Sequence, residues 1–123
     1  PDAERQRIKQ LCMQGKVKLL YISPEGLMGE VDWLLPRMDI SLIAIDEAHC
    51  ISQWGYDFRP SYLNIAEIRD LLPGVPVLAL TATATPEVVN DIQERLRFKE
   101  KNVFQKSFAR KNLAYIVRKT EDK

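Results

Sequence analysis

Apolar and polar residues alternate along this chain in blocks that match short strands and helices. Three apolar runs have the length and the flanking turn residues of buried strands. They are residues 17–22, 42–45 and 75–80. Because each run is almost wholly apolar instead of alternating, we expect a parallel sheet that is covered on both faces.

The intervening segments have the periodicity of helices. A first helix should begin at Asp2, whose side chain can cap it, and should end at Gly15. Residues 62–72 place apolar side chains around most of a helical surface, which predicts a largely buried helix. Thr85 followed by Pro86 is typical of a helix start, with the threonine as cap.

The remaining segments carry weaker signals. Gly26, Gly29 and Pro36 bound a short helical or irregular stretch, and two further strands are predicted at residues 102–107 and 113–118. Strands that alternate with helices indicate the α/β class, with a mostly parallel sheet flanked by helices. The 123 residues suffice for one domain with one core but not for two.

Charge is distributed unevenly along the chain. Residues 1–96 hold nine Lys/Arg and fourteen Asp/Glu, a balance of −5, whereas residues 97–123 hold nine and three, a balance of +6. A basic tail of this kind favours a polyanionic partner, but a solvated surface explains it equally well. No stretch has the length of a membrane span, so we expect no membrane partner. The chain starts without Met, and we expect it to be a piece of a longer protein.

Cysteine and histidine are rare in the sequence. Cys12, Cys50 and His49 are the only residues of these types. They do not have the spacing of a zinc site, and we expect no zinc within this segment. Both cysteines fall in apolar segments, where they should pack as small hydrophobic side chains. Nothing in the composition requires an oxidising compartment, so we expect an intracellular location.

The clearest chemical signal is a pair of carboxylates after the second apolar run. Asp46 and Glu47 follow residues 42–45 directly and begin the tetrapeptide Asp-Glu-Ala-His, which ends at His49. Open α/β sheets bind ligands at the carboxyl ends of their strands. There, one carboxylate can hold Mg²⁺ through water and its neighbour can deprotonate an attacking water. The alternative is an acidic turn without chemistry.

An aromatic loop follows the acidic tetrapeptide. We use this name for residues 50–60, which contain three aromatic side chains and one arginine. Aromatic faces stack on bases, and arginine pairs with phosphate. Alternatively, Trp54 and Phe58 would simply anchor the loop to the core.

Small hydroxyl side chains follow the third apolar run. Thr81 and Thr83 lie within residues 81–85, and in a parallel sheet this segment ends on the same side as Asp46. Threonine hydroxyls there can hydrogen-bond a neighbouring carboxylate or His49 without adding bulk. Capping of a helix accounts for Thr85 but leaves the other two threonines unexplained.

Together these segments resemble the RecQ family of superfamily 2 DNA helicases. The resemblance covers nearly the whole chain, from residues 19–25 to residues 112–113. It is most specific where Asp-Glu-Ala-His runs directly into Cys-Ile-Ser-Gln-Trp-Gly, followed by Asp-Phe-Arg-Pro at residues 57–60. The resemblance implies the RecA-like fold of P-loop NTPase type. Residues 1–123 would form the C-terminal part of the first helicase motor domain.

The resemblance implies a role for each residue of the nucleotide site. Asp46 would bind Mg²⁺ through water, and Glu47 would be the general base for the water that attacks ATP. His49 would couple this site to the aromatic loop and to the Thr-Ala-Thr segment, where Thr81 and Thr83 would complete the nucleotide site.

The resemblance also implies contacts with DNA. Gln53, Trp54, Phe58 and Arg59 match the family's DNA-sensing loop. The two aromatic rings would meet bases, while the arginine would meet phosphate or the nucleotide. Ser23 corresponds to a motif near the DNA path, which is a weaker correspondence.

The chain departs from the family pattern at three positions. Tyr56 stands where His is usual, Gly26 stands where Arg is usual, and Lys111 stands where Pro is common. Arg110 and Asn112 match a stretch that leads toward the second motor domain. No G-x-x-x-x-G-K-[ST] motif occurs in the sequence. The phosphate-binding loop and the second motor domain are therefore expected in other segments of the parent chain.

The implied activity is that of an ATP-dependent 3′–5′ DNA helicase in DNA repair and recombination. Its cofactors would be ATP and Mg²⁺, and its partners would be single-stranded DNA, duplex junctions and the remaining motor-domain segments. It would work at the nucleoid of a bacterium or in the nucleus of a eukaryote. Alone, the 123-residue chain should not hydrolyse ATP. The alternative is a non-catalytic module that binds single-stranded nucleic acid. A third possibility is that the chain is merely a folded fragment.

Overall fold

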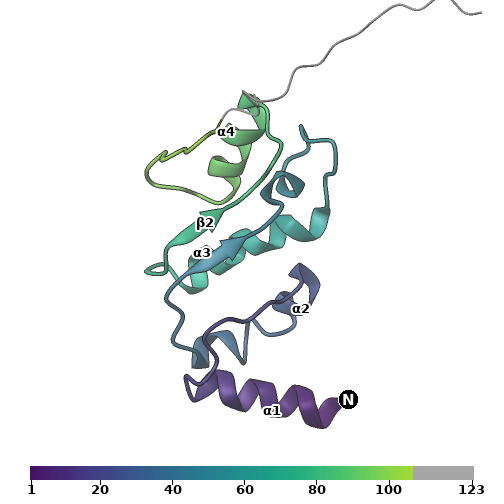
Figure 1. Cartoon of the computed structure of the whole chain (residues 1–123), viewed down its shortest axis with the longest axis vertical. Helices are drawn as coiled ribbons and strands as arrows, with labels where there is room; N and C mark the ends of the chain where they lie inside the picture. Colours follow the sequence, from purple (N-terminus) through teal and green to yellow (C-terminus); the bar gives the residue numbers. More distant parts are fainter. Residues whose placement is uncertain (107–123) are drawn as a thin grey trace, which may run out of the picture.

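The computed structural model describes residues 1–106 and contains short helices around a small sheet (Figure 1). In chain order the elements are α1 (Asp2–Met13), α2 (Pro24–Met28), the 3₁₀ helix η1 (Leu35–Arg37), β1 (Ile43–Ile45), the 3₁₀ helices η2 (Ala48–Ile51) and η3 (Pro60–Glu67), α3 (Ile68–Leu71), β2 (Val77–Ala79) and α4 (Pro86–Arg95). In Figure 1 α1 and α4 lie at opposite ends of the long axis, with the strands between them.

Strands β1 and β2 pair in parallel, which confirms the expected strand direction for the second and third apolar runs. Ile43 lies opposite Val77 in the register. The pairing continues beyond the strands, because Leu80 N–H donates to the Ile45 carbonyl and Ala48 N–H donates to the Leu80 carbonyl, each at 2.9 Å. The segments that leave the two strands therefore begin side by side.

The sheet is covered on one face only by the described residues. Ile45 is buried, whereas Ala44 and its register partner Leu78 are exposed, Leu78 by 46%. The expectation of a sheet covered on both faces is therefore wrong for the described part of the chain. The physical reason is that no element of residues 1–106 shields these two side chains from solvent.

Residues 17–22 form no strand, contrary to the prediction. Leu19 and Tyr21 are 68% and 86% exposed. An apolar run becomes a strand only when its N–H and C=O groups meet those of a neighbouring strand. Within residues 1–106 the sheet consists of β1 and β2, so this run has the composition of a strand without a partner.

The predicted strand at residues 102–107 is likewise absent over residues 102–106, which have no regular structure. Ser107, Arg110, Lys111, Asn112 and the strand predicted at residues 113–118 lie outside the described residues.

The predicted ends of the first helix and the predicted start of the last helix are confirmed with one exception. Thr85 caps α4 by accepting a hydrogen bond from the Val88 N–H at 3.3 Å. Gly15 follows α1 with φ of +71°, a conformation that glycine adopts without strain. Asp2, however, does not cap α1. It lies inside the first turn, after Pro1 at the cap position, where its carboxylate still interacts favourably with the helix dipole.

The helix predicted at residues 62–72 is helical but not continuous. Its first part belongs to the 3₁₀ helix η3, and only Ile68–Leu71 is α-helical. Spacing of apolar residues cannot separate three from 3.6 residues per turn over two turns, because the two patterns diverge by little more than one position.

One core joins elements from the whole second half of the described chain. Its buried members come from β1, η2, η3, α3 and α4 and from the residue after α4, namely Ile45, Ala48, Ile51, Ile65, Ile68, Val88, Ile92 and Leu96. The turn that carries the acidic pair is thus bounded by buried residues on both sides. Cys12 and Cys50 are buried and free, which confirms that they pack as small hydrophobic side chains. Within residues 1–106, every helix is too short or too polar to span a bilayer.

Candidate functional site

The acidic pair occupies a sharp turn between β1 and η2. Both carboxylates are exposed, and Asp46 Oδ1 accepts a hydrogen bond from the Glu47 N–H at 2.9 Å. Glu47 has φ of 51° and ψ of 43°, the left-handed conformation that is uncommon outside glycine. Ala48, the next residue, is completely buried. The two acids therefore project from a strained turn that leads into buried residues, and strained backbone of this kind clusters at functional sites.

His49 links Glu47 to the segment that follows β2. Only 2% of its surface is exposed. Its Nδ1 atom is 2.8 Å from Thr81 Oγ1 and 3.4 Å from Glu47 Oε2. Because the carboxylate can only accept, and Thr81 Oγ1 can donate to the Thr83 carbonyl at 3.4 Å, the network is best satisfied when Nδ1 carries the proton.

The imidazole of His49 also stacks on a ring from the aromatic loop. The centroids of His49 and Tyr56 are 5.0 Å apart, with an angle of 14° between the planes. The Tyr56 hydroxyl is 3.4 Å from Thr83 Oγ1. Sequence reasoning noted Tyr56 only as a departure from the family pattern. The sequence pattern does not indicate that these two rings, seven positions apart, stack on each other, because the path of the irregular loop decides it.

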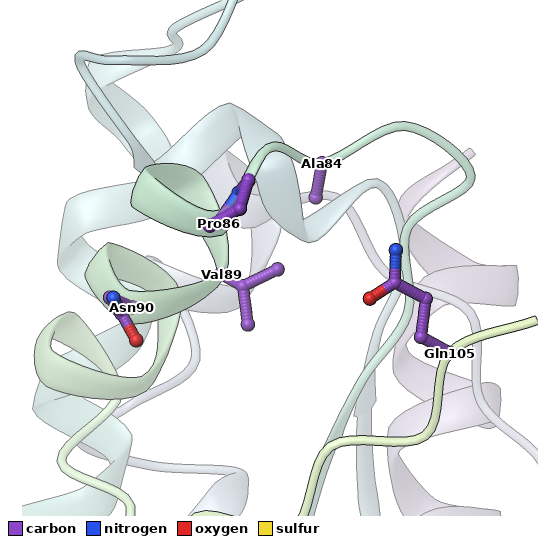
Figure 2. A pocket seen from close by; sticks show the side chains of 5 residues that line it. All are labelled: Ala84, Pro86, Val89, Asn90 and Gln105. Carbon is purple, nitrogen blue, oxygen red and sulfur yellow. The ribbon is translucent and has the colours of Figure 1, made fainter.

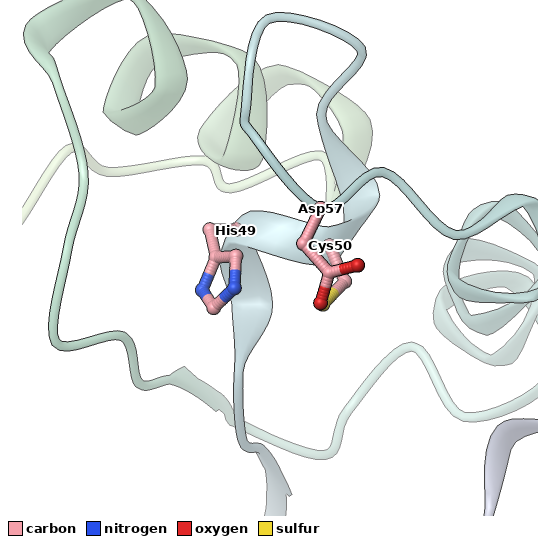
Figure 3. Close-up of side chains that lie close together, drawn as sticks. All are labelled: His49, Cys50 and Asp57. Carbon is pink, nitrogen blue, oxygen red and sulfur yellow. The ribbon is translucent and has the colours of Figure 1, made fainter.

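A cluster of three possible metal ligands lies at the base of the aromatic loop. Figure 3 shows His49, Cys50 and Asp57 close together. Their candidate ligand atoms lie within 4.8 Å of one another. Asp57 Oδ2, however, already accepts from Arg59 Nη2 at 3.2 Å and contacts the Cys50 thiol at 3.9 Å. Burial, followed by the charge of Asp57, raises the pKa of Cys50 and so favours the thiol over the metal-binding thiolate.

The contacts among Cys50, Asp57 and Arg59 hold the two ends of the aromatic loop together. Besides the side-chain contacts, the Arg59 N–H donates to the Cys50 carbonyl at 2.8 Å. The hydrogen bond to Asp57, then its charge, raises the pKa of Arg59. Arg59 remains more than half exposed, so its guanidinium keeps N–H groups directed at solvent that can meet an anion.

The tip of the aromatic loop presents its side chains to solvent. Gln53 is exposed and Trp54 is 76% exposed, whereas Phe58 is half-buried. The alternative that Trp54 anchors the loop to the core is wrong in this structure, because so large a ring buried in the core would not be exposed to this extent. A base could stack on Trp54 directly, while Phe58 offers less of its ring.

Ser23 has a local structural function. It caps α2, where its hydroxyl accepts a hydrogen bond from the Gly26 N–H at 3.0 Å. Helix α2 packs against η3, which starts at Pro60, the last residue of the aromatic loop. The DNA contact inferred for Ser23 stays a prediction, and its side-chain oxygen is already engaged with the backbone.

Tyr62 supports the acidic turn from η3. Its hydroxyl donates to the backbone carbonyl of Asp46 at 3.3 Å. Burial is the main cause that raises the pKa of Tyr62, so the group stays protonated and able to donate at neutral pH. Sequence reasoning missed Tyr62, because it lies sixteen positions from its partner in a segment whose spacing suggested only a helix.

Two small pockets, of about 180 and 210 Å³, lie among residues other than the acidic pair. One pocket of about 180 Å³ lies between the start of α4 and a later segment (Figure 2). Ala84, Pro86, Val89 and Asn90 line one side, and Gln105 lies opposite. Ligand pockets commonly measure ~300–1,000 Å³, so each of these two pockets is smaller than a typical ligand site.

The exposed acids fit the chemistry of a hydrated magnesium ion. Asp46 uses Oδ1 within the turn, and among the described residues its other carboxylate oxygen has no partner. Mg²⁺ prefers oxygen ligands, retains several waters and is commonly held by one or two carboxylates together with phosphate oxygens. Asp46 can therefore hold a water of such an ion, while Glu47 and its link to His49 stand beside it.

Comparison with known proteins identifies the family. The DEAD/DEAH box helicase family model matches residues 1–92. The chain is 50% identical over 112 residues to ATP-dependent DNA helicase RecQ of Bacillus subtilis. It is 46% identical over 115 residues to putative ATP-dependent RNA helicase R290 of Acanthamoeba polyphaga mimivirus, and 44% over 107 to RecQ-like DNA helicase blm-1 of Caenorhabditis elegans.

These alignments cover 89%, 91% and 80% of the chain but 19%, 21% and 11% of the three relatives. The chain thus spans about a fifth or less of the length of these relatives. Their names agree with the resemblance that rests on the acidic tetrapeptide and the aromatic loop. The chain belongs to the DEAD/DEAH box helicases and is a segment of the RecQ type.

Proposed function

We propose that this chain is the C-terminal part of the first RecA-like motor domain of an ATP-dependent 3′–5′ DNA helicase. One observation carries the proposal: buried His49 contacts Glu47 and Thr81 through Nδ1 and stacks on Tyr56 of the aromatic loop. A strand-tip acid pair is thereby in continuous contact with a loop that presents an exposed Trp. The names of the relatives support the substrate class, and the polarity rests on the family resemblance alone.

The residues of the acidic turn divide the chemistry between them. Bound Mg²⁺ and ATP would supply charge neutralisation and the phosphoryl group. Asp46 would hold a water of the bound Mg²⁺ through the carboxylate oxygen that the turn does not use. Glu47 accepts the proton of the attacking water, and its contact with His49 limits the directions that its carboxylate can take. Thr81 holds the imidazole, and Thr83 holds the neighbouring segment of the loop.

The aromatic loop is the side of the site that meets nucleic acid. Trp54 stacks on a base, and Gln53 lies beside it with amide groups free to hydrogen-bond. Phe58 supports the loop and offers its exposed ring edge to a second base. Arg59 meets a phosphate while remaining bound to Asp57. Ser23, at the start of α2, adds a contact along the same path.

A substitution of the general base tests the proposal in the full-length protein that carries this segment. Glu47→Gln keeps the size of the side chain but removes its basicity. General base catalysis contributes about 10²–10⁴-fold, so DNA-stimulated ATP turnover should fall by about that factor while ATP still binds. Glu94→Gln, which removes another exposed carboxylate from α4, is the matched control. Turnover of Glu47→Gln equal to that of Glu94→Gln would reject the proposal.

The isolated 123-residue chain should not hydrolyse ATP. Phosphoryl transfer requires several cationic groups around the γ-phosphate, and two neighbouring carboxylates repel a polyanion. The phosphate-binding loop and the second motor domain are proposed to come from other segments of the parent protein. An ATPase assay of residues 1–123 with single-stranded DNA is expected to show only background. Turnover that Glu47→Gln abolishes would contradict this expectation.

A second candidate function is binding of single-stranded nucleic acid without catalysis. The exposure of Trp54 favours it, since base stacking on an aromatic face is tolerant of sequence. Affinity for labelled single strands should decrease with salt and should fall in Trp54→Ala and Arg59→Ala. Because the viral relative is named as an RNA helicase, DNA and RNA strands should be compared. Binding without any DNA-stimulated turnover in the full-length protein would favour this candidate over the helicase.

The cellular setting follows from the same proposal. A RecQ-type DNA helicase would act in DNA repair and recombination, at the nucleoid of a bacterium or in the nucleus of a eukaryote. Its partners would be single-stranded DNA, duplex junctions and the remaining motor-domain segments. Imaging of a fluorescently tagged full-length protein together with a DNA stain would test the location.

A further inference from the structure

The peptide group that joins Asp46 to Glu47 is held at both of its ends. Its N–H, from Glu47, donates to Asp46 Oδ1 at 2.9 Å. Its carbonyl, from Asp46, accepts from the Tyr62 hydroxyl at 3.3 Å. The first contact is local to the turn, whereas the second comes from η3, sixteen positions along the chain. The orientation of this peptide group therefore depends on Tyr62 as well as on the turn itself.

The two flanks of the acidic turn are fixed without Tyr62. Before the turn, the Ile45 carbonyl accepts from the Leu80 N–H at 2.9 Å. After it, the Ala48 N–H donates to the Leu80 carbonyl at 2.9 Å. Because both flanks are bonded to the segment after β2, the turn can change shape only in its middle. The available movement is a rotation of the peptide group between the two acids, which changes ψ of the first and φ of the second.

Backbone strain favours that rotation. Glu47 has φ of 51°, in the left-handed region. Reversal of the peptide group would carry this φ into the negative range that most side chains prefer. Strained residues persist when the surrounding structure over-determines their conformation. Reversal would break the hydrogen bond from Tyr62 to the Asp46 carbonyl, so this bond opposes release of the strain.

Tyr62 is itself held in place and remains a donor. Its ring packs against the core, and its N–H donates to the Arg59 carbonyl at 3.0 Å. Burial is the main cause that raises the pKa of Tyr62, so its hydroxyl keeps the proton that the carbonyl of the turn requires. The hydroxyl therefore acts on the turn from a ring whose position the core determines.

We infer that Tyr62 is a positioning residue for the ATP hydrolysis proposed above, on which this inference rests. Its hydroxyl holds the peptide group between Asp46 and Glu47 in the orientation that keeps Asp46 Oδ1 on the Glu47 N–H. That orientation leaves the second carboxylate oxygen of Asp46 for a water of Mg²⁺. It also fixes the direction in which the Glu47 side chain leaves the backbone. Reversal of the peptide group would release Asp46 Oδ1 and redirect the general base.

Removal of the Tyr62 hydroxyl in the full-length protein that carries this segment tests the inference. Tyr62→Phe keeps the ring that packs against the core. Tyr21→Phe, which removes the hydroxyl of a side chain that is 86% exposed, is the matched control. For Tyr62→Phe we expect hydrogen exchange of the Glu47 amide, measured without nucleotide or Mg²⁺, to accelerate about two- to tenfold, the range that one neutral hydrogen bond confers. The kcat for ATP should fall by a similar factor, and the Mg²⁺ concentration for half-maximal turnover should rise. The KM for ATP at saturating Mg²⁺ should stay unchanged.

Three results would overturn the inference. Equal exchange of the Glu47 amide in Tyr62→Phe and Tyr21→Phe shows that the hydroxyl does not hold the turn. Faster exchange with an unchanged kcat shows that the reaction does not use the held orientation. Uniformly faster exchange throughout β1 and η3 assigns Tyr62 to stability of the fold. Failure of the proposed function is distinct, because the unsubstituted protein would then show no turnover sensitive to Glu47→Gln, while exchange of the Glu47 amide would still report on the turn.

Discussion

Replacement of Gly55 by alanine tests the contact between the aromatic loop and the acidic site. The added Cβ atom would lie 3.0 Å from the His49 carbonyl oxygen and 3.4 Å from the Ser52 carbonyl oxygen. Both neighbours are backbone atoms. The His49 carbonyl also accepts from the Ser52 N–H at 3.1 Å, so it cannot retreat without breaking a turn of η2. We therefore expect the loop to lift away from His49.

The magnitude follows from the cost of overpacking. Extra methyl groups in a packed site typically cost ~1–3 kcal/mol. The Arg59 N–H, which closes the loop on the Cys50 carbonyl at 2.8 Å, should then exchange with solvent about 5–150 times faster. Gly74→Ala is the matched control, since its Cβ would meet nothing within 4 Å. It should be neutral or stabilising by about 0.4–1 kcal/mol, because alanine restricts the unfolded chain.

Hydrogen exchange of the full-length protein, read at the loop amides, measures this difference. DNA-stimulated ATP turnover of the same variants shows whether the lifted loop also uncouples the site. Equal exchange of the Arg59 amide in Gly55→Ala and Gly74→Ala would refute the reasoning. Equal exchange would show that the close approach to the His49 carbonyl does not constrain the structure of the aromatic loop.

Two further predictions concern stability. Thr85→Ala should destabilise α4 by about 1 kcal/mol, because it leaves the Val88 N–H without its cap. Amide hydrogen exchange at the start of α4 measures this loss. As the control, Thr85→Ser keeps the hydroxyl and should restore protection. The raised pKa of Cys50 means that its thiol holds the proton more tightly in the folded state than in the unfolded chain. Its contribution to the free energy of unfolding is therefore complete below the ordinary thiol pKa of about 8.5 and is lost as pH rises above that value. Denaturant midpoints from pH 7.5 to 9.5 should therefore fall, and should fall less in Cys50→Ser; identical slopes would contradict the assignment.

Local sequence patterns predicted the two strands, the cap of α4 and much of the candidate site. The apolar runs at residues 42–45 and 75–80 predicted the two strands that form, because a short apolar run between turn residues is the local pattern typical of a buried strand. The carboxylates that follow the first run, and Thr85 before Pro86, have local signatures that do not depend on distant partners. The acidic tetrapeptide and the loop after it were also specific enough to indicate the family.

The tertiary structure decided which of these elements found partners. Residues 17–22 have the composition of a strand, but strand formation needs a neighbour to complete the hydrogen-bond ladder, and composition cannot supply one. The same holds for the site. That Thr81 bonds His49 was an open alternative in the sequence, and that Tyr56 stacks on the same ring was not foreseen. Both contacts depend on the parallel register of β1 and β2 and on the path of an irregular loop, which are set by packing across the fold and not by neighbours along the chain.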